Sequence, residues 1–291
     1  MGEIFSLLSA VFWGLAVIFF KRTGETVAPL ALNLFRVAFS SAVFLLTLAV
    51  LQQPLLGVAP PRDYAILAVS GIIAIAISDT FFHMALNRVG AGIQAVVDCL
   101  YSPAVVLFGF LLLDERLGPG QFVGMGLVIA GVVVAAGHAP PPGTSGRTLA
   151  AGVAFGVIAM ATLALGIVIA KPVLERSSVL WATAVRQLVS LVVLLALALL
   201  SPRHRFMLKA LRPHRDWRFS VPGTLLGSYI ALLCWIAGMK LTRAGTAAIF
   251  NQTSTIFIFV FAALLLREPF TRRKALAGVL ALAGIVVTMA S

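Results

Sequence analysis

The sequence predicts an all-α integral membrane protein with ten transmembrane helices arranged as two inverted five-helix repeats. The composition is the first reason, because 60% of the residues are hydrophobic, only 11% are charged and the mean hydropathy is +1.05. Soluble domains are about half apolar and about a quarter charged. The second reason is a series of ten apolar runs, each long enough to cross roughly 30 Å of hydrocarbon as a helix. The third is a long stretch of sequence that occurs twice.

The ten runs follow one another with short gaps between them. The first run is expected to be a retained span rather than a cleaved signal peptide, because the first ten residues carry only the acidic Glu3 and no basic residue. The predicted spans are Ile4–Phe20, Leu30–Val50, Tyr64–Leu86, Gly92–Leu113, Gln121–Ala136, Leu149–Ala170, Leu180–Leu200, Phe219–Gly238, Thr246–Leu266 and Lys274–Ala290.

The repeated stretch is Arg88–Leu117 in the first half and Arg243–Phe270 in the second. Each copy opens with Arg-x-Gly and ends in Leu-Leu-Leu-x-Glu, so that Glu115 corresponds to Glu268 once a two-residue gap is allowed. Repeats of this length indicate duplication of a structural unit.

Lys21 and Arg36 recur 150 positions later as Lys171 and Arg186, so the duplication is expected to cover both halves of the chain. Five spans in each half force the second half to enter the membrane inverted relative to the first. The expected units are a first five-helix repeat at 1–137, a linker at 138–148 and a second, inverted repeat at 149–291.

The net charge of +12 has a membrane explanation rather than a nucleic-acid one, because the Lys and Arg residues cluster in the gaps between spans. Gaps after the odd-numbered spans hold fourteen of these residues and the gaps on the opposite side hold six. The positive-inside rule then predicts that the gaps after the odd-numbered spans are cytoplasmic and that both termini lie outside. Most of the excess lies in Arg203–Arg218 and Arg267–Lys274, which could also contact anionic lipid head groups.

Several classes of function lack their sequence signatures. There is no Gly-x-x-x-x-Gly-Lys loop for ATP, so neither ATP hydrolysis by this chain nor an ATPase subunit is implied. There is no His-Glu-x-x-His or Cys-x-x-Cys pair for zinc, and Cys99 and Cys234 lie inside apolar runs, so no metal, cofactor or disulfide is expected. Helix packing is the favoured role for the small-x-x-x-small pairs Gly120/Gly124, Gly152/Gly156 and Gly223/Gly227.

A family resemblance is carried by short motifs spread over essentially the whole chain. They are Trp13-Gly14, Leu34-x-Arg36, the tract around Pro103 that closes on Asp114-Glu115-Arg116-Leu117, Ala130-Gly131, Glu268-Pro269 and Ala283-Gly284. With these motifs the chain resembles the EamA-type drug/metabolite transporters. The resemblance implies a ten-helix, multi-pass secondary transporter of the bacterial cytoplasmic (inner) membrane, usually an exporter of amino acids, related metabolites or drugs. Such a transporter works by alternating access between two pseudo-symmetric halves.

Buried polar residues are the candidates for substrate contact, because ionisable groups inside a bilayer are rare and usually functional. Asp79 and His83 stand four residues apart on one face of the third span, where they could instead form a structural pair. Helical rise places Asp79 and Asp98 at matching depth, about 12 and about 13 Å from the turn that joins their spans. Through the repeat, the counterparts of these three residues are Cys234, Gly238 and Asn251.

Arg36 and Arg186 recur in both halves, each about 10–12 Å from the start of its span. One interpretation is structural, with long side chains that extend to the head groups. In the other, one guanidinium binds a substrate carboxylate through two hydrogen bonds.

A polar run in the ninth span includes the candidates Asn251, Gln252 and Ser254, and it needs partners of the kind that a water-filled cavity supplies. Among the aromatic residues, Trp13, Tyr101 and Trp235 are candidates for a cavity lining, with interface anchoring or packing as the alternative. Pro103 is expected to lie in mid-span, where it could mark a hinge.

The leading hypothesis is an exporter of amino acids, aromatic or bulky apolar ones favoured, or of related small metabolites, either coupled to protons or facilitated. The alternative is proton-coupled efflux of lipophilic cationic drugs. A membrane-embedded enzyme is a third reading, but no aspartates occur at metal-binding spacing. The expected partners are a small-molecule substrate, the lipid bilayer and protons.

Overall fold

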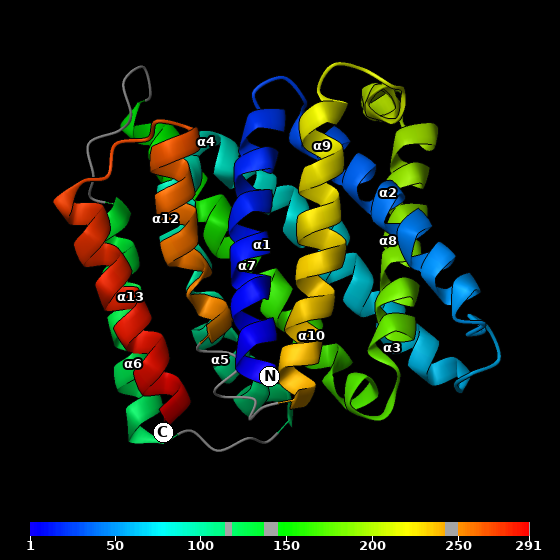
Figure 1. Cartoon of the computed structure of the whole chain (residues 1–291), viewed down its shortest axis with the longest axis horizontal. Helices are drawn as coiled ribbons and strands as arrows, with labels where there is room; N and C mark the ends of the chain where they lie inside the picture. The colour runs from blue at the N-terminus through cyan, green and yellow to red at the C-terminus, as the bar shows by residue number, and fades with distance from the viewer. Residues whose placement is uncertain (114–117, 137–144, 242–249, 291) are drawn as a thin grey trace.

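The computed structural model describes residues 1–113, 118–136, 145–241 and 250–290, and all regular structure within these ranges is helical. Most helices run roughly alongside one another, and the N- and C-termini lie at the same end of the bundle (Figure 1). The helices are α1 (Gly2–Thr23), α2 (Pro29–Val50), α3 (Pro61–Gly71), the π-helix η1 (Ile72–Ile77), α4 (Ser78–Asp98), α5 (Tyr101–Leu113), α6 (Pro119–Ala136), α7 (Gly146–Arg176), α8 (Val179–Leu200), the 3₁₀-helix η2 (Pro202–Leu211), α9 (Trp217–Thr224), the π-helix η3 (Leu225–Ala231), α10 (Leu232–Leu241), α12 (Ser254–Leu265) and α13 (Arg272–Ala290).

By length and composition, seven helical runs in the described residues are long and apolar enough to cross a membrane. Two shorter apolar helices, Tyr101–Leu113 and Phe250–Leu265, accompany them. The all-α character and the multiple apolar spans predicted from composition are therefore confirmed. The seven runs are Gly2–Thr23, Pro29–Val50, Pro61–Asp98, Pro119–Ala136, Gly146–Arg176, Val179–Leu200 and Trp217–Gly238.

The predicted fourth span, Gly92–Leu113, is wrong as a single helix, because the chain leaves the helical path at Cys99 and Leu100. Pro103 explains the break, since proline has no N–H to donate to the carbonyl of Cys99. Pro103 therefore lies in the first turn of α5, where a missing donor costs little, and not at a hinge within a helix.

A second break occurs inside α4 at Gly90, whose φ of 79° and ψ of 170° are outside the helical region. The helix restarts with the amides of Ala91 and Gly92, which donate to the two carboxylate oxygens of Glu268 at 2.8 and 3.0 Å. A carboxylate in this position complements the unpaired amides and the positive end of a helix. Lys274 Nζ, 3.5 Å from Glu268, completes this connection between α4 and the start of α13.

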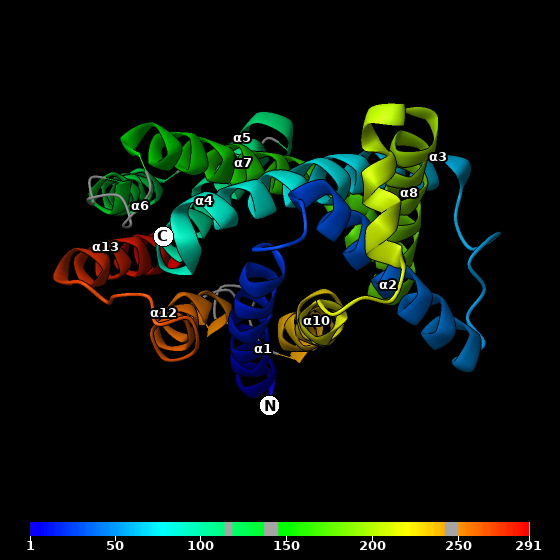
Figure 2. The same ribbon diagram turned by 90° about the horizontal axis from the view of Figure 1, so that it is seen from above.

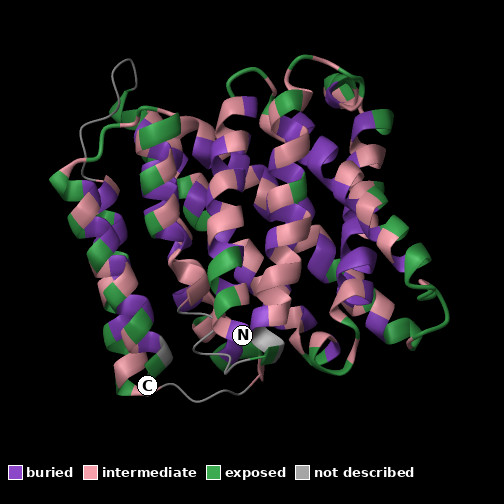
Figure 3. Cartoon of the chain, viewed as in Figure 1, coloured by how far each residue is buried: buried purple, intermediate pink, exposed green. Residues whose placement is uncertain are grey.

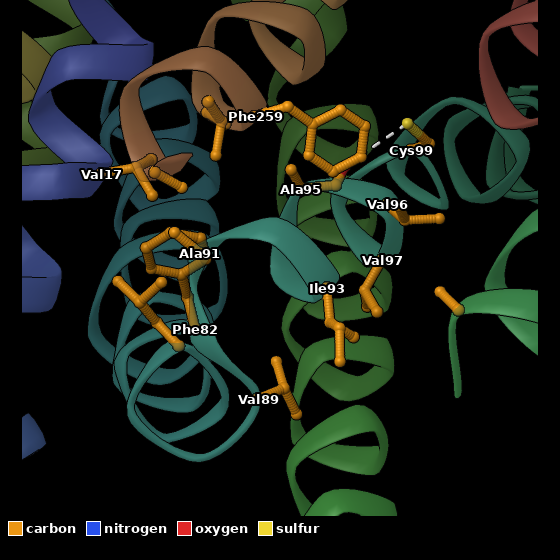
Figure 4. Packing of buried hydrophobic residues seen from close by; sticks show 14 of the residues in the cluster. Val17, Phe82, Val89, Ala91, Ile93, Ala95, Val96, Val97, Cys99 and Phe259 are labelled. Atoms are coloured by element: carbon orange, nitrogen blue, oxygen red, sulfur yellow. Dashed lines mark hydrogen bonds between the residues drawn. The ribbon is translucent and has the colours of Figure 1, made fainter. Parts of the chain in front are cut away.

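The second arm of α4 lies in the core of the bundle. Figure 4 shows the side chains of Ile93 and Val97 pointing toward α7, and both belong to a buried apolar cluster that also includes Phe82 and Phe259. Large apolar side chains such as those of Val133, Leu200 and Leu264 are instead exposed. Figure 3 shows exposed residues along most of the helices of the bundle. Apolar residues both inside and outside are expected for a protein whose solvent is lipid.

Close helix pairs connect the two halves of the chain: α6 packs on α13, α4 on α7 and α2 on α8, while α1 packs against α9, η3, α10 and α12 (Figure 2). The packing role predicted for the small-x-x-x-small pairs is confirmed at Gly124, Gly152, Gly156, Gly223 and Gly227. At each of these glycines, an added Cβ would lie within 3 Å of an atom that belongs to a neighbouring helix.

The two π-helices widen the third predicted span and the span formed by α9, η3 and α10. Asn33 compensates for the altered backbone bonding of η1, because its Nδ2 donates to the carbonyls of Ile75 and Ala76 at 3.1 Å each and to Thr80 Oγ1 at 3.0 Å. π-Helical turns within longer helices are frequent at functional sites. Both of these contribute to the wall of the same cavity.

Candidate functional site

One cavity of about 270 Å³ lies between the two halves of the molecule. Its lining comes from the helices α1, α2, α4, α7, α8 and α10, from the two π-helices η1 and η3, from the start of α5 and from residues 251–254. Ten of the eleven residues singled out from the sequence line it, and His83 does not. The ten are Trp13, Arg36, Asp79, Asp98, Tyr101, Arg186, Trp235, Asn251, Gln252 and Ser254.

Arg36 is buried and forms an ion pair with Asp79 across the cavity wall. Its Nη1 donates to Ser228 Oγ at 3.0 Å and its Nη2 to Asn33 Oδ1 at 3.4 Å, while its guanidinium lies 5.9 Å from the ring centre of Phe20. A buried ion pair needs such additional partners to offset the loss of hydration. The two charges of this pair balance each other.

Two structural interpretations made from the sequence are wrong here. Arg36 and Arg186 do not extend to head groups, because each is only 6% exposed and both face the cavity. Asp79 pairs with Arg36 rather than with His83. His83 packs edge-on against Phe20 at 5.2 Å, and its ring nitrogens have no hydrogen-bond partner in the described residues.

Arg186 differs from Arg36 in its surroundings. No carboxylate in the described part of the chain pairs with it, and its Nε has no hydrogen-bond partner. The sequence repeat explains the difference, because the counterpart of Asp79 is Cys234, which carries no charge at neutral pH. Arg186 therefore brings an unbalanced positive charge to the cavity.

Close backbone packing holds Arg186 in place. A Cβ added at Gly71 would lie only 2.5 Å from the carbonyl oxygen of Arg186, so a larger residue would push α8 away from α3. Ser190 Oγ lies 2.9 Å from the Gly71 carbonyl oxygen and 2.7 Å from that of Arg186, and it can donate to either. The guanidinium is thus presented from a rigid helix contact.

Asp98 ends the second arm of α4, just before the break at Cys99. Its Oδ1 accepts a hydrogen bond of 2.7 Å from Gln94 Nε2, while its Oδ2 has no partner in the described residues. As expected from their matching depth, Asp79 and Asp98 line the same cavity from the two arms of α4. A carboxylate with an unsatisfied oxygen is costly to bury, so this group is suited to a proton or to a cationic donor.

The polar run before α12 obtains part of its hydrogen bonding from neighbouring helices. Ser9 Oγ lies 3.0 Å from Asn251 Oδ1, and Gln252 Nε2 donates to Ser102 Oγ at 3.0 Å. Asn251, Gln252 and Ser254 also line the cavity. The predicted need for polar partners is met by side chains as well as by the cavity.

Aromatic side chains form much of the remaining wall. Trp13, Tyr101 and Trp235 are joined by Phe82, whose ring centre lies 5.8 Å from that of Trp13. The wall also holds Ser9, Thr183, Gln187 and Ser228, which the sequence reasoning did not select. Thr183 could have been found, because it lies one helical turn before Arg186, whereas Ser228 depends on packing between the halves.

Comparison with known proteins places the chain among transporters. The model of the EamA-like transporter family matches residues 1–137 and 150–290. An uncharacterized transporter of Haemophilus influenzae is 26% identical over 45% of this chain and 43% of its own. An uncharacterized transporter of Archaeoglobus fulgidus is 25% identical over 44% of each chain. The matched part thus spans less than half the length of these relatives.

A solved crystal structure of another protein has a similar fold over nearly the whole chain. The TM-score is 0.68, with 98% of this chain and 95% of that chain covered, and the sequence identity is 18%. At this identity the likeness concerns the fold alone.

Proposed function

We propose, from the premise that this chain belongs to the EamA-like transporter family, that it is a secondary transporter which exports amino acids, aromatic or bulky apolar ones favoured, or closely related small metabolites. The observation that carries the substrate proposal is the guanidinium of Arg186, which is buried in the cavity wall and has no carboxylate partner in the described residues. The planar fork of an arginine binds a carboxylate through two hydrogen bonds.

The remaining groups of an amino acid also have complementary partners. Asp98, with its unsatisfied oxygen, is our candidate for the substrate's ammonium group and for a coupling proton. Asp79 is a poorer candidate for both, because Arg36 already neutralises it. The aromatic rings of Trp13 and Trp235 would receive an apolar side chain.

The proposal includes ten membrane helices in two inverted halves. It is supported by the reciprocal packing of the helices, because α1 packs against η3, α10 and α12 in the second half, as α7 packs against η1, α4 and α5 in the first. A π-helix in each half and the location of both termini at one end of the bundle are further support. Glu115 and the 138–148 linker are largely outside the described residues, so these parts of the expected repeat rest on sequence.

The test is uptake into proteoliposomes of labelled phenylalanine and of two analogues, phenethylamine, which lacks the carboxylate, and 3-phenylpropionate, which lacks the ammonium group. Each is measured with and without an imposed pH gradient. We expect Arg186→Gln to weaken phenylalanine transport by about tenfold to a hundredfold, the loss of one charged hydrogen-bonding partner, because Gln cannot form the paired charged bonds. Phenethylamine transport should change little.

Arg62→Gln is the matched control, because Arg62 is exposed at the start of α3 and away from the cavity. Equal losses in both variants, or equal loss of phenylalanine and phenethylamine in Arg186→Gln, would contradict carboxylate recognition by Arg186. Phenylalanine flux that ignores the pH gradient would indicate facilitated export.

Efflux of lipophilic cations is the second candidate, and the unsatisfied oxygen of Asp98 favours it, because a buried carboxylate can hold a cation. The cavity volume of about 270 Å³ favours small metabolites over bulky drugs, since drug-sized ligands occupy sites of roughly 300–1,000 Å³. Flux of a lipophilic cation alone, accelerated by the gradient, would establish this alternative. A membrane-embedded enzyme receives no support from the transporter family match.

A further inference from the structure

The segment between α8 and α9 forms a separate feature at the end of the bundle opposite the termini. The 3₁₀-helix η2 is seen end-on in Figure 1, as the yellow-green coil beside the end of α8, while the surrounding helices are seen from the side. Its axis therefore crosses the end of the bundle, roughly perpendicular to the helices. This is the orientation of a helix lying in the plane of a membrane surface.

One side of η2 is fixed to the bundle. Met207 and Ala210 are buried in an apolar cluster with Ala31 and Leu34 of α2. Trp217 Nε1 donates to the carbonyl of Ala210 at 3.1 Å, which connects η2 to the start of α9. The position of η2 is therefore defined by packing on the membrane helices.

The other side of η2 and the chain that follows it are strongly basic. Six cationic side chains between Ser201 and Arg218 are exposed, and no ion pair within the described residues neutralises any of them. The acidic residue in this segment is Asp216, which lies 3.8 Å from His214. The six are Arg203, Arg205, Lys209, Arg212, Arg215 and Arg218.

Exposed apolar side chains adjoin these cations. Leu199 and Leu200, the last residues of α8, are 57% and 83% exposed, and Phe206 on η2 is 40% exposed. The cations begin at Arg203, three residues after Leu200. An apolar wall that ends in a group of cations matches the acyl chains and head group of a phospholipid.

The basic charge is concentrated at one end of the molecule. The connection at the opposite end, 51–60 between α2 and α3, contains no charged residue. Each Lys or Arg near a membrane surface strengthens attraction to anionic lipid, and these contributions add over a cluster. Zwitterionic lipid offers no such gain.

We propose that η2 and the end of α8 form a binding site for an anionic phospholipid, whose phosphate is bound by Arg203, Arg205 and Lys209 and whose acyl chains lie against Leu199 and Leu200. The site is on the outer face of the bundle, separate from the cavity. It does not depend on the transport activity proposed above.

The test is a titration of delipidated full-length protein in detergent with dioleoyl phosphatidylglycerol or dioleoyl phosphatidylcholine, with bound lipids counted by native mass spectrometry. The variant is Arg203→Gln/Arg205→Gln/Lys209→Gln. Its charge-matched control is Arg62→Gln/Arg147→Gln/Arg267→Gln, which removes three exposed cations elsewhere. All substituted residues are exposed, and thermal midpoints are compared to verify that both variants remain folded.

The expected result is at least a tenfold loss of phosphatidylglycerol affinity in the η2 variant, less than a twofold change in the control and unchanged binding of phosphatidylcholine. The proposal is overturned if the η2 variant keeps the wild-type affinity for phosphatidylglycerol or if both variants lose this affinity equally. It is also overturned if the η2 variant loses binding of both lipids to the same extent. Displacement of bound phosphatidylglycerol by millimolar inorganic phosphate would also overturn it, because the site would then recognise a soluble anion.

Discussion

The two arginines that recur in the halves of the chain occupy the same cavity in different electrostatic states. Arg36 has Asp79, Ser228 and Asn33 as partners, whereas Arg186 has no carboxylate partner in the described residues. Removing the partner of a buried charge strongly destabilises a protein. A buried charge that has no partner in the native structure already lowers the stability of the folded state. The two sites should therefore respond in opposite ways to the same substitution.

Replacing one member of the Arg36–Asp79 pair should destabilise the protein by about 3–5 kcal/mol, because the other charge is left buried and unpaired. The double variant Arg36→Gln/Asp79→Asn should lose less than the sum of the single variants, with a coupling energy of about 1–3 kcal/mol. Arg186→Gln should cost little stability or increase it, even though we expect it to impair transport. The measurement is unfolding by denaturing detergent, followed by circular dichroism. Additive effects of the two single changes would contradict a functional ion pair in the cavity wall.

At the scale of the element, α4 is the helix on which the site depends. Its two arms meet at Gly90, and each arm presents one aspartate to the cavity. The restart after Gly90 is capped by Glu268 from the opposite half, so the shape of α4 depends on a contact between the halves. Neither Gly90 nor Glu268 lines the cavity, so this contact shapes α4 from outside the site.

Gly90→Ala should disrupt this arrangement. The backbone angles at Gly90 belong to a region that is open almost only to glycine, and a Cβ there would lie 2.8 Å from Glu268 Oε1. We expect a loss of about 2–3 kcal/mol in unfolding free energy, from backbone strain and the displaced carboxylate. Gly126→Ala on α6 is the matched control, because nothing lies within 4 Å of an added Cβ there, and alanine favours the helix. If the two variants change the unfolding free energy equally, the helix break at Gly90 is not required for the fold.

At the scale of the whole molecule, those features could be predicted from the sequence whose physical signals are local in the chain. Composition and apolar run length predicted helices that could cross a membrane, and polar and aromatic residues within the spans supplied ten residues that line the cavity. The break at Cys99 was missed because continuous hydrophobicity conceals a helix end, although Pro103 carries the signal. The pairing of Asp79 with Arg36 was missed because it depends on how α2 packs on α4, which helical periodicity does not contain.

The distribution of charge over the whole molecule predicts how it is oriented in the membrane. The end of the bundle formed by η2 and the start of α13 carries exposed Arg and Lys side chains, whereas the connection at 51–60 is uncharged. Basic loops are retained in the cytoplasm. We therefore expect position 215 to face the cytoplasm and position 53 to face outward, on the same side as both termini.

The measurement is labelling with a membrane-impermeant maleimide of single cysteines, Gln53→Cys and Arg215→Cys, in a chain whose Cys99 and Cys234 are replaced by alanine. Both positions are exposed in the structure, so accessibility is limited by the membrane rather than by packing. Gln53→Cys should react in intact bacterial cells, and Arg215→Cys only after permeabilisation. The opposite labelling pattern would mean that the molecule has the inverse orientation in the membrane. Reaction of both in intact cells would mean that these two ends of the bundle are not separated by a bilayer, which would contradict the arrangement of the helices as membrane spans.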